Sequence, residues 1–163
     1  MKISTMGHYG LSSLIDVAVN QARGPVTLND IATRQSISVK YLWQVINPLK
    51  ESGFLRATRG AKGGYVLARP PEEITMLDVL TTLEGPVSIL KCMTIKDACN
   101  RIHSCVSRTV WKEVNTAVEN TLAHITLAEV LRRCKNLSEP ETVLHSLTAQ
   151  PLPSVPLGAS TLT

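Results

Sequence analysis

Two short helical segments joined by a tight turn constrain this chain more than any other feature of its sequence. Thr27 and Asp30 are typical of a helix N-terminus, because the threonine hydroxyl can accept a hydrogen bond from a free backbone N–H. Ser38 can cap a second helix, which carries apolar residues at helical spacing and stops at Gly53. Because Pro48 lies inside this second helix, we expect a kink or a new turn near it. The pattern predicts a helix-turn-helix.

A glycine-rich turn follows the two helices. Residues 54–58 and 65–68 are β-prone runs, and residues 59–64 between them read RGAKGG. Glycine tolerates the positive φ angles that a tight hairpin needs. A hairpin directly after a helix-turn-helix is a wing, and its tip carries Arg59 and Lys62 on a backbone slim enough to enter a DNA groove.

The charge of the chain is unevenly distributed. Residues 1–70 hold nine Lys and Arg against three Asp and Glu, a balance of +6, whereas residues 71–163 hold eight against ten, a balance of −2. A basic first part favours an anionic partner, and double-stranded operator DNA is the first candidate. The alternatives are a solvated basic surface, or a winged helix that binds another protein.

Winged helix-turn-helix domains contact DNA through the start of the second helix and through the wing. A glutamine there can bond adenine at two positions, lysine can contact guanine or phosphate, and arginine at a wing tip suits a narrow minor groove. The predicted DNA contacts are Lys2, Ser38, Lys40, Tyr41, Gln44, Arg56, Arg59, Gly60, Lys62 and Gly63.

The other helices follow from apolar spacing and from caps at Thr75 and Thr126. We expect them at about 8–22, 75–83, 107–125 and 126–134. The predicted fold is mainly α with a small β-wing: a winged helix-turn-helix domain at 1–70, a cluster-binding loop with dimerisation helices at 71–138, and a disordered tail at 139–163.

The long helix predicted from about residue 107 has one apolar stripe. Little of the remaining chain is available to cover it, so we expect the stripe to form a homodimer interface, with packing onto its own domain as the alternative. The stripe consists of Val110, Val114, Ala117, Val118, Thr121, Leu122 and Ile125.

Three of the four cysteines lie within fifteen residues. Cys92, Cys99 and Cys105 have the spacing C-x6-C-x5-C, which is wider than the C-x2-C pairs of common zinc sites. Three thiolates on one loop can hold an iron–sulfur cluster with a fourth donor. Spacing alone leaves a cluster, a zinc site and simple packing or redox cysteines open. Cys134, at the end of an apolar helix, is more typical of packing.

Other classes of protein find little support in the sequence. The N-terminus lacks the apolar segment of a signal peptide, and no apolar run is long enough to span a membrane. We therefore expect a cytoplasmic protein without a membrane partner. There is no nucleophile–base pair, phosphate-binding loop or carboxylate pair, so we expect neither an enzyme nor a small-molecule substrate.

These pieces together resemble a known family. Residues 1–135 are similar to the iron–sulfur cluster regulators, the IscR-like members of the Rrf2 group of winged-helix transcription factors. The segments that carry the resemblance are MKISTMGHYGL, ISVKYLWQVINPLKESGFL, RATRGAKGGYVLARP, EITMLDVLTTLEGPV, and the three cysteines followed by Trp111.

The resemblance implies a homodimer with crossed long helices that binds operator DNA, often as a repressor. It implies that Cys92, Cys99 and Cys105 hold a cluster, 2Fe–2S or alternatively 4Fe–4S, that senses iron–sulfur status, iron, nitric oxide or redox state. In some relatives the position of His8 supplies a ligand from the partner subunit. We expect His8 to be the fourth ligand, ahead of His103, Cys134, a small thiol or water.

The chain departs from the pattern of the relatives at three positions. Arg108 stands where 2Fe–2S members often have a histidine, and arginine stays protonated and cannot donate to iron. Trp43 stands where the recognition helix usually has glutamate, and His8 replaces a common arginine. The alternative function is a cluster-free regulator of the same fold, controlled by thiol oxidation or by a protein partner.

Overall fold

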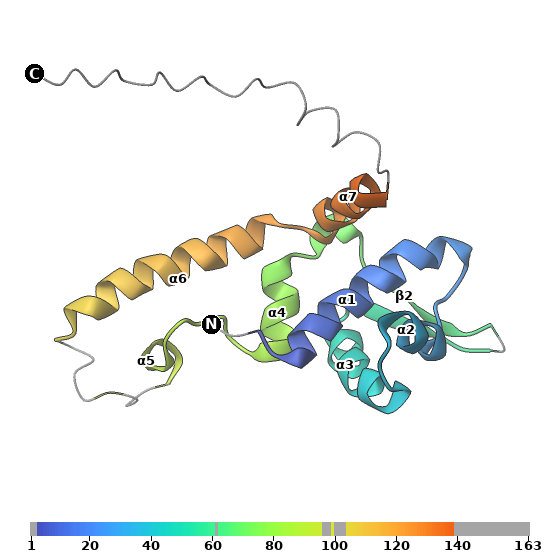
Figure 1. Cartoon of the computed structure of the whole chain (residues 1–163), viewed down its shortest axis with the longest axis horizontal. Coiled ribbons are helices and arrows are strands. Elements are labelled where there is room, and N and C mark those ends of the chain that lie inside the picture. Colours follow the sequence, from blue (N-terminus) through green and yellow to red (C-terminus); the bar gives the residue numbers. More distant parts are fainter. Residues whose placement is uncertain (1–2, 61, 96–98, 100–103, 139–163) are drawn as a thin grey trace, which may run out of the picture.

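Helix α1 packs against α2, α3, α4 and α7, whereas α6 contacts α4 (Figure 1). The computed structural model describes residues 3–60, 62–95, 99 and 104–138. Its elements are α1 (Thr5–Asn20), η1 (Gln21–Arg23), α2 (Leu28–Gln35), α3 (Val39–Glu51), β1 (Leu55–Thr58), β2 (Gly64–Leu67), η2 (Pro71–Glu73), α4 (Met76–Glu84), α5 (Lys91–Thr94), α6 (Val106–His124) and α7 (Leu127–Ser138).

The predicted helix-turn-helix is present as α2 and α3. The hydroxyl of Thr27 accepts from the backbone N–H of Asp30 at 3.1 Å, and that of Ser38 accepts from Tyr41 at 3.2 Å. Between the two helices Ser36 adopts a left-handed conformation, with φ 54°. Of the two alternatives expected near Pro48, a kink or a new turn, the new turn was wrong, because α3 continues through this residue as one helix to Glu51.

The wing forms directly after α3, as predicted. Strands β1 and β2 pair antiparallel, with Leu55 opposite Leu67 at the open end. Val26, just before α2, adds a short bridge to Tyr65 through two backbone hydrogen bonds of 2.9 and 2.8 Å. The wing is thereby fixed to the base of the helix-turn-helix. We call α1, α2, α3 and the wing the head.

One hydrophobic core joins the head to the second part of the chain. Leu14 and Val17 of α1 lie in it with residues of α2, α3, α4 and α7. Two backbone hydrogen bonds close the far side of this core: Met76 N–H donates to Ile125 at 2.9 Å, and Leu127 N–H donates to Ile74 at 2.8 Å. The apolar end of α6 is held by the same residues.

The structure corrects three predicted boundaries. Helix α1 begins at Thr5 rather than near residue 8, because Ser4 caps it. Helix α7 continues to Ser138, beyond the predicted end near Cys134. The stretch after α4, expected as a loop, contains the short helix α5. The predicted tail at 139–163 lies outside the described residues.

Helix α6 extends away from the packed helices as an arm, and the segment that precedes it contains α5 (Figure 1). We call residues 85–105, which connect α4 to α6, the cysteine loop. Within the described part of the chain, none of the helices has the length and apolar character needed to span a membrane.

Candidate nucleic-acid interface and cysteine loop

Helix α3 separates an apolar face from a polar one. Leu42, Val45, Ile46 and Leu49 are buried in the core, which fixes the rotation of the helix. Lys40 and Gln44 are one turn apart and are both exposed on the other side. Ser38 is also exposed while it caps the helix. The N-terminal half of α3 therefore presents polar and cationic groups to solvent.

The wing presents basic side chains on a turn that requires glycine. Arg56, Arg59 and Lys62 are exposed, and Gly60 has a φ of 115°, which disfavours any other residue. A side chain at the half-buried Gly63 would approach the carbonyl oxygen of Gly60 within 2.9 Å. Neither glycine can be replaced without strain, so the narrow turn depends on both of them.

The structure brings most of the predicted DNA contacts into the head. They come from two elements, the start of α3 and the wing, which are joined through the core. Lys2 is the exception, because it lies outside the described residues. Arg69, which was not among the predicted contacts, has a structural role: it donates to the carbonyl oxygens of Gly53 and Ser52 and lies over the ring of Phe54.

An ion pair between the exposed Arg34 and the buried Asp16 holds α2 against α1. Arg34 donates to both carboxylate oxygens of Asp16, at 2.8 and 2.6 Å, and Asp16 is buried. The hydrogen bond to Asp16 raises the pKa of the Arg34 guanidinium, although burial acts in the opposite direction. The two helices carry complementary charges that keep the helix-turn-helix in a fixed position on α1.

The three clustered cysteines occupy different parts of the cysteine loop. Cys92 is half-buried on α5, Cys99 is exposed, and Cys105 is half-buried at the residue before α6. Cys99 and Cys105 line one pocket, together with Ser104, Val106 and Ser107. Cys92 is not among the residues that line it. Among the described residues, no three His, Cys, Asp or Glu side chains gather in a way that could hold a metal ion.

The surroundings of the loop suit an anionic group. The buried Nε of Arg108, one turn into α6 from Cys105, has no hydrogen-bond partner among the described residues. Asn115 is buried and anchors the loop, because its side chain accepts from the N–H of Ile89 at 2.9 Å and donates to Val87. An unpaired cationic donor three residues after Cys105 is chemically compatible with a thiolate-bound cluster.

The other candidate ligands lie on different elements. His8 is exposed on the second turn of α1, Cys134 is half-buried on α7, and His103 lies outside the described residues. The ring of Tyr9 lies edge-on to that of His8, with centroids 5.3 Å apart, and edge-on to Tyr41 of α3, with centroids 6.0 Å apart. A line of aromatic contacts therefore runs from His8 to the helix that carries Lys40.

The start of α1 is tied to the end of α4. The N–H and the hydroxyl of Ser4 both donate to Oε1 of Glu84, at 2.8 and 2.6 Å. Glu84 is the last residue of α4 and directly precedes the cysteine loop. A carboxylate at this end of α1 also interacts favourably with the helix dipole.

The apolar stripe of α6 is divided between two environments. Leu122 and Ile125 pack against the core of the chain. In the first half of the stripe, Val110 is 56% and Val114 is 41% exposed, and Val106, one turn before Val110, is 79% exposed. The large apolar side chains exposed there are Val106, Val110, Trp111 and Val114.

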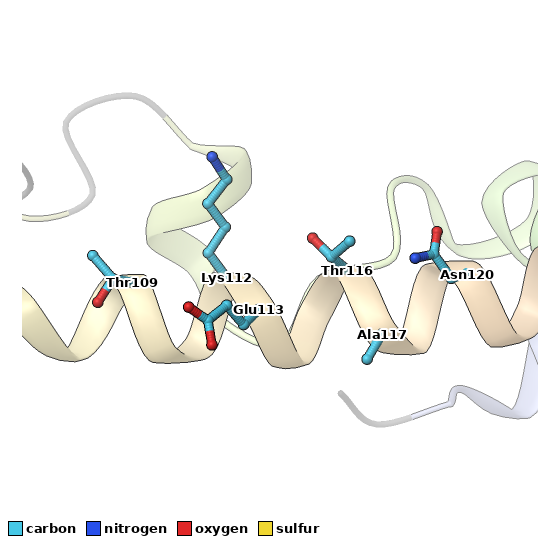
Figure 2. A pocket seen from close by; sticks show the side chains of 6 residues that line it. All are labelled: Thr109, Lys112, Glu113, Thr116, Ala117 and Asn120. Atoms are coloured by element: carbon cyan, nitrogen blue, oxygen red, sulfur yellow. The ribbon is translucent and has the colours of Figure 1, made fainter.

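The adjoining face of α6, which shares Ala117 with the stripe, is mostly polar and borders a shallow pocket (Figure 2). The side chains that line the pocket are Thr109, Lys112, Glu113, Thr116, Ala117 and Asn120. The helix is therefore amphipathic along a stretch that the other described residues leave exposed.

Sequence reasoning missed the residues that connect the parts of the site. Tyr9, Glu84 and Asn115 act through partners that are 26 to 80 residues away in the chain, or through rings on another helix. Only one signal was available: a polar asparagine within an apolar helix indicates a buried hydrogen bond.

Comparison with known proteins identifies the family. Residues 3–133 match the family model Rrf2, described as an iron-dependent transcriptional regulator. The chain belongs to the Rrf2 family. The protein rrf2 of Nitratidesulfovibrio vulgaris is 39% identical over 132 residues, which cover 81% of this chain and 88% of that protein.

Two solved structures support the Rrf2 assignment and the fold. IscR of T. potens superposes with a TM-score of 0.71 at 35% identity, over 89% of this chain and 96% of the other. CymR, the global cysteine regulator of B. subtilis, superposes with a TM-score of 0.70 at 34% identity, over 82% and 98%. The expected winged-helix fold is confirmed. The protein is a DNA-binding transcriptional regulator rather than an enzyme.

Removal of the wing-tip cation tests the nucleic-acid interface. Arg59→Ala should weaken operator binding by about 1–3 kcal/mol if Arg59 contacts base edges. If it contacts phosphate alone, the salt dependence of log K should fall by about one unit. Fluorescence anisotropy at several salt concentrations measures both effects.

The matched control is Arg133→Ala, which removes the same charge from α7, where Arg133 pairs with Glu129. An equal loss of affinity in both variants would mean that only net charge matters, and no loss in either would exclude the wing from the interface.

Proposed function

We propose that this Rrf2 protein is a homodimeric regulator of operator DNA that senses iron–sulfur cluster, iron or redox status through a cluster bound by Cys92, Cys99 and Cys105. The observation that carries the proposal is the position of the cysteine loop. It lies between Glu84, which accepts two hydrogen bonds from the N-cap residue of α1, and α6, whose apolar stripe is partly exposed.

The homodimer follows from the exposed half of α6. Val106, Val110 and Val114 recur every four residues, so they form one continuous apolar face on an extended arm. A second copy of the same helix supplies a matching face, and a two-fold axis also suits a palindromic operator.

Charge placed on this face should separate the subunits. Val110→Glu combined with Val114→Glu would bury like charges across the two-fold axis and weaken dimerisation by on the order of 100-fold or more. Analytical ultracentrifugation should show monomers, and operator binding should fall with the loss of the dimer.

The matched control carries the same two charges on the polar face, as Thr109→Glu with Thr116→Glu (Figure 2). This control should stay dimeric. A stable dimer in the first variant would show that the subunits associate through a different surface.

The residues of the loop fit a cluster chemically. Cys99 and Cys105 already open onto one pocket, and Cys92 belongs to the same loop on a four-residue helix. When bound, a cluster supplies a redox-active and iron-dependent charge at this position. The donor at Arg108 can offset the negative charge of three thiolates. The description of the family as iron-dependent supports the same assignment.

His8 is the proposed fourth ligand, supplied by the partner subunit. A neutral imidazole is a good iron ligand, and His8 is exposed on the helix that the head packs around. Ligation there would fix the start of α1, and with it Tyr9 and Tyr41. Loss of ligation would release that constraint and shift the population of head positions, which alters operator binding.

Anaerobic purification tests the ligands. The wild-type protein should be brown and contain about two iron and two sulfide per subunit for a 2Fe–2S cluster. Single Ala variants of the three loop cysteines should lose the visible absorbance, whereas Cys134→Ala should retain it. His8→Ala should shorten the lifetime of the absorbance.

His124→Ala is the matched histidine control, because His124 is exposed on α6 and interacts with the carbonyl of Asn120. Equal cluster lifetimes in the wild type and the His8 variant would exclude His8 as a ligand. A colourless wild-type protein with zinc would exclude the cluster.

The alternative is a cluster-free regulator controlled by thiol oxidation or by a protein partner. It is favoured by the similarity to CymR, a global cysteine regulator, and by the exposure of Cys99 beside Cys105. A colourless, iron-free protein whose operator affinity changes on oxidation would support this function.

A further inference from the structure

Helix α3 exposes two large apolar side chains at its N-terminal half. Trp43 is 53% exposed and Val39 is 42% exposed. They lie one turn apart, at i and i+4, and therefore form one small patch. Neither belongs to the buried stripe of α3, which consists of Leu42, Val45, Ile46 and Leu49. The fold does not require their apolar character.

The position of the patch on α3 indicates a role in binding. Single exposed apolar residues are common and need no explanation. Here two of them adjoin Lys40 and Gln44, the exposed polar pair one position further along the same helix. Both pairs therefore face outward from the helix whose start is aimed at the major groove in helix-turn-helix complexes.

The chemistry of the major groove offers an apolar partner. Among the four bases only thymine presents an apolar group there, its 5-methyl, and apolar side chains recognise thymine through it. We propose that Trp43 and Val39 determine operator specificity by contacting thymine 5-methyl groups, beside bases contacted by Lys40 and Gln44. This inference rests on the operator binding stated under Proposed function.

Charge favours DNA over a protein as the occupant of the patch. Lys40 and Lys50 are exposed along α3, Glu51 is the exposed acidic residue at its end, and the first 70 residues carry a balance of +6. The wing adds Arg56 and Arg59 to the same head. DNA is a polyanion, which complements the basic head, and its thymine methyl groups complement the apolar patch.

Replacement of thymine by uracil tests the contact, because it removes the methyl group and keeps the base pair. An operator is first selected from random duplexes with the full-length, anaerobically purified protein. Each thymine is then replaced singly by uracil, and affinity is measured by anisotropy at fixed salt. At one or more positions the wild type should lose about fourfold in affinity for each methyl removed.

Two variants assign the effect to the patch. In Trp43→Ala the penalty for uracil at those positions should disappear, and in Val39→Ala it should decrease. Gln44→Ala should bind less tightly but keep the full uracil penalty, since it removes a different contact. Because Trp43 and Val39 are both exposed, neither variant should unfold the head.

The outcomes separate this inference from the function on which it rests. If the wild type selects an operator but no uracil substitution weakens binding, the methyl contact is wrong and operator binding stands. The methyl contact is also wrong if Trp43→Ala keeps the full loss of affinity on uracil substitution. If the patch instead binds a protein, no single uracil replacement changes the affinity, and the methyl contact is again wrong. If no preferred sequence is selected, sequence-specific operator binding fails and this inference fails with it.

Discussion

The contact between the start of α1 and the end of α4 determines where the parts of this regulator lie. Ser4 gives both its backbone N–H and its hydroxyl to Glu84, which satisfies groups that a helix start otherwise leaves unpaired. Gly7 and Gly10 lie against Glu84 and Leu83, where a Cβ atom would collide with those side chains. The two helices can be this close only because both positions are glycine.

This contact joins the start of α1, in the head, to the residue that directly precedes the cysteine loop. Glu84 is followed directly by the loop, and α1 carries His8, which contacts Tyr9, and Tyr9, which contacts Tyr41 of the recognition helix. A cluster that fixes His8 from the partner subunit would therefore act on a helix that already has rigid contacts on both sides. Such a route changes operator affinity only if ligation favours one position of the head over another.

The local features of the fold could be predicted from the sequence, whereas the long-range contacts could not. The caps at Thr27 and Ser38 and the glycines of the wing act within a few residues, so their types and spacing define them. The start of α1 was predicted too late, because its cap is completed by a carboxylate 80 residues away.

The candidate site shows the same division. Residue type identified the loop cysteines and the basic wing. Periodicity identified the stripe of α6 but could not show that Leu122 packs on the core while Val110 stays exposed. The exposure of Trp43 and the aromatic line from His8 to Tyr41 depend on how α1 and α3 are rotated, which follows only from the packed core.

The central claim is that the state of the cysteine loop controls the head through α1. The most direct test measures operator affinity on one anaerobic preparation, before and after removal of its iron, at a single salt concentration. We predict that the wild-type affinity differs between the two states and that Tyr9→Leu, which removes the aromatic ring between His8 and Tyr41, reduces this difference. Identical operator affinity of the iron-loaded and iron-free wild-type protein would contradict the account.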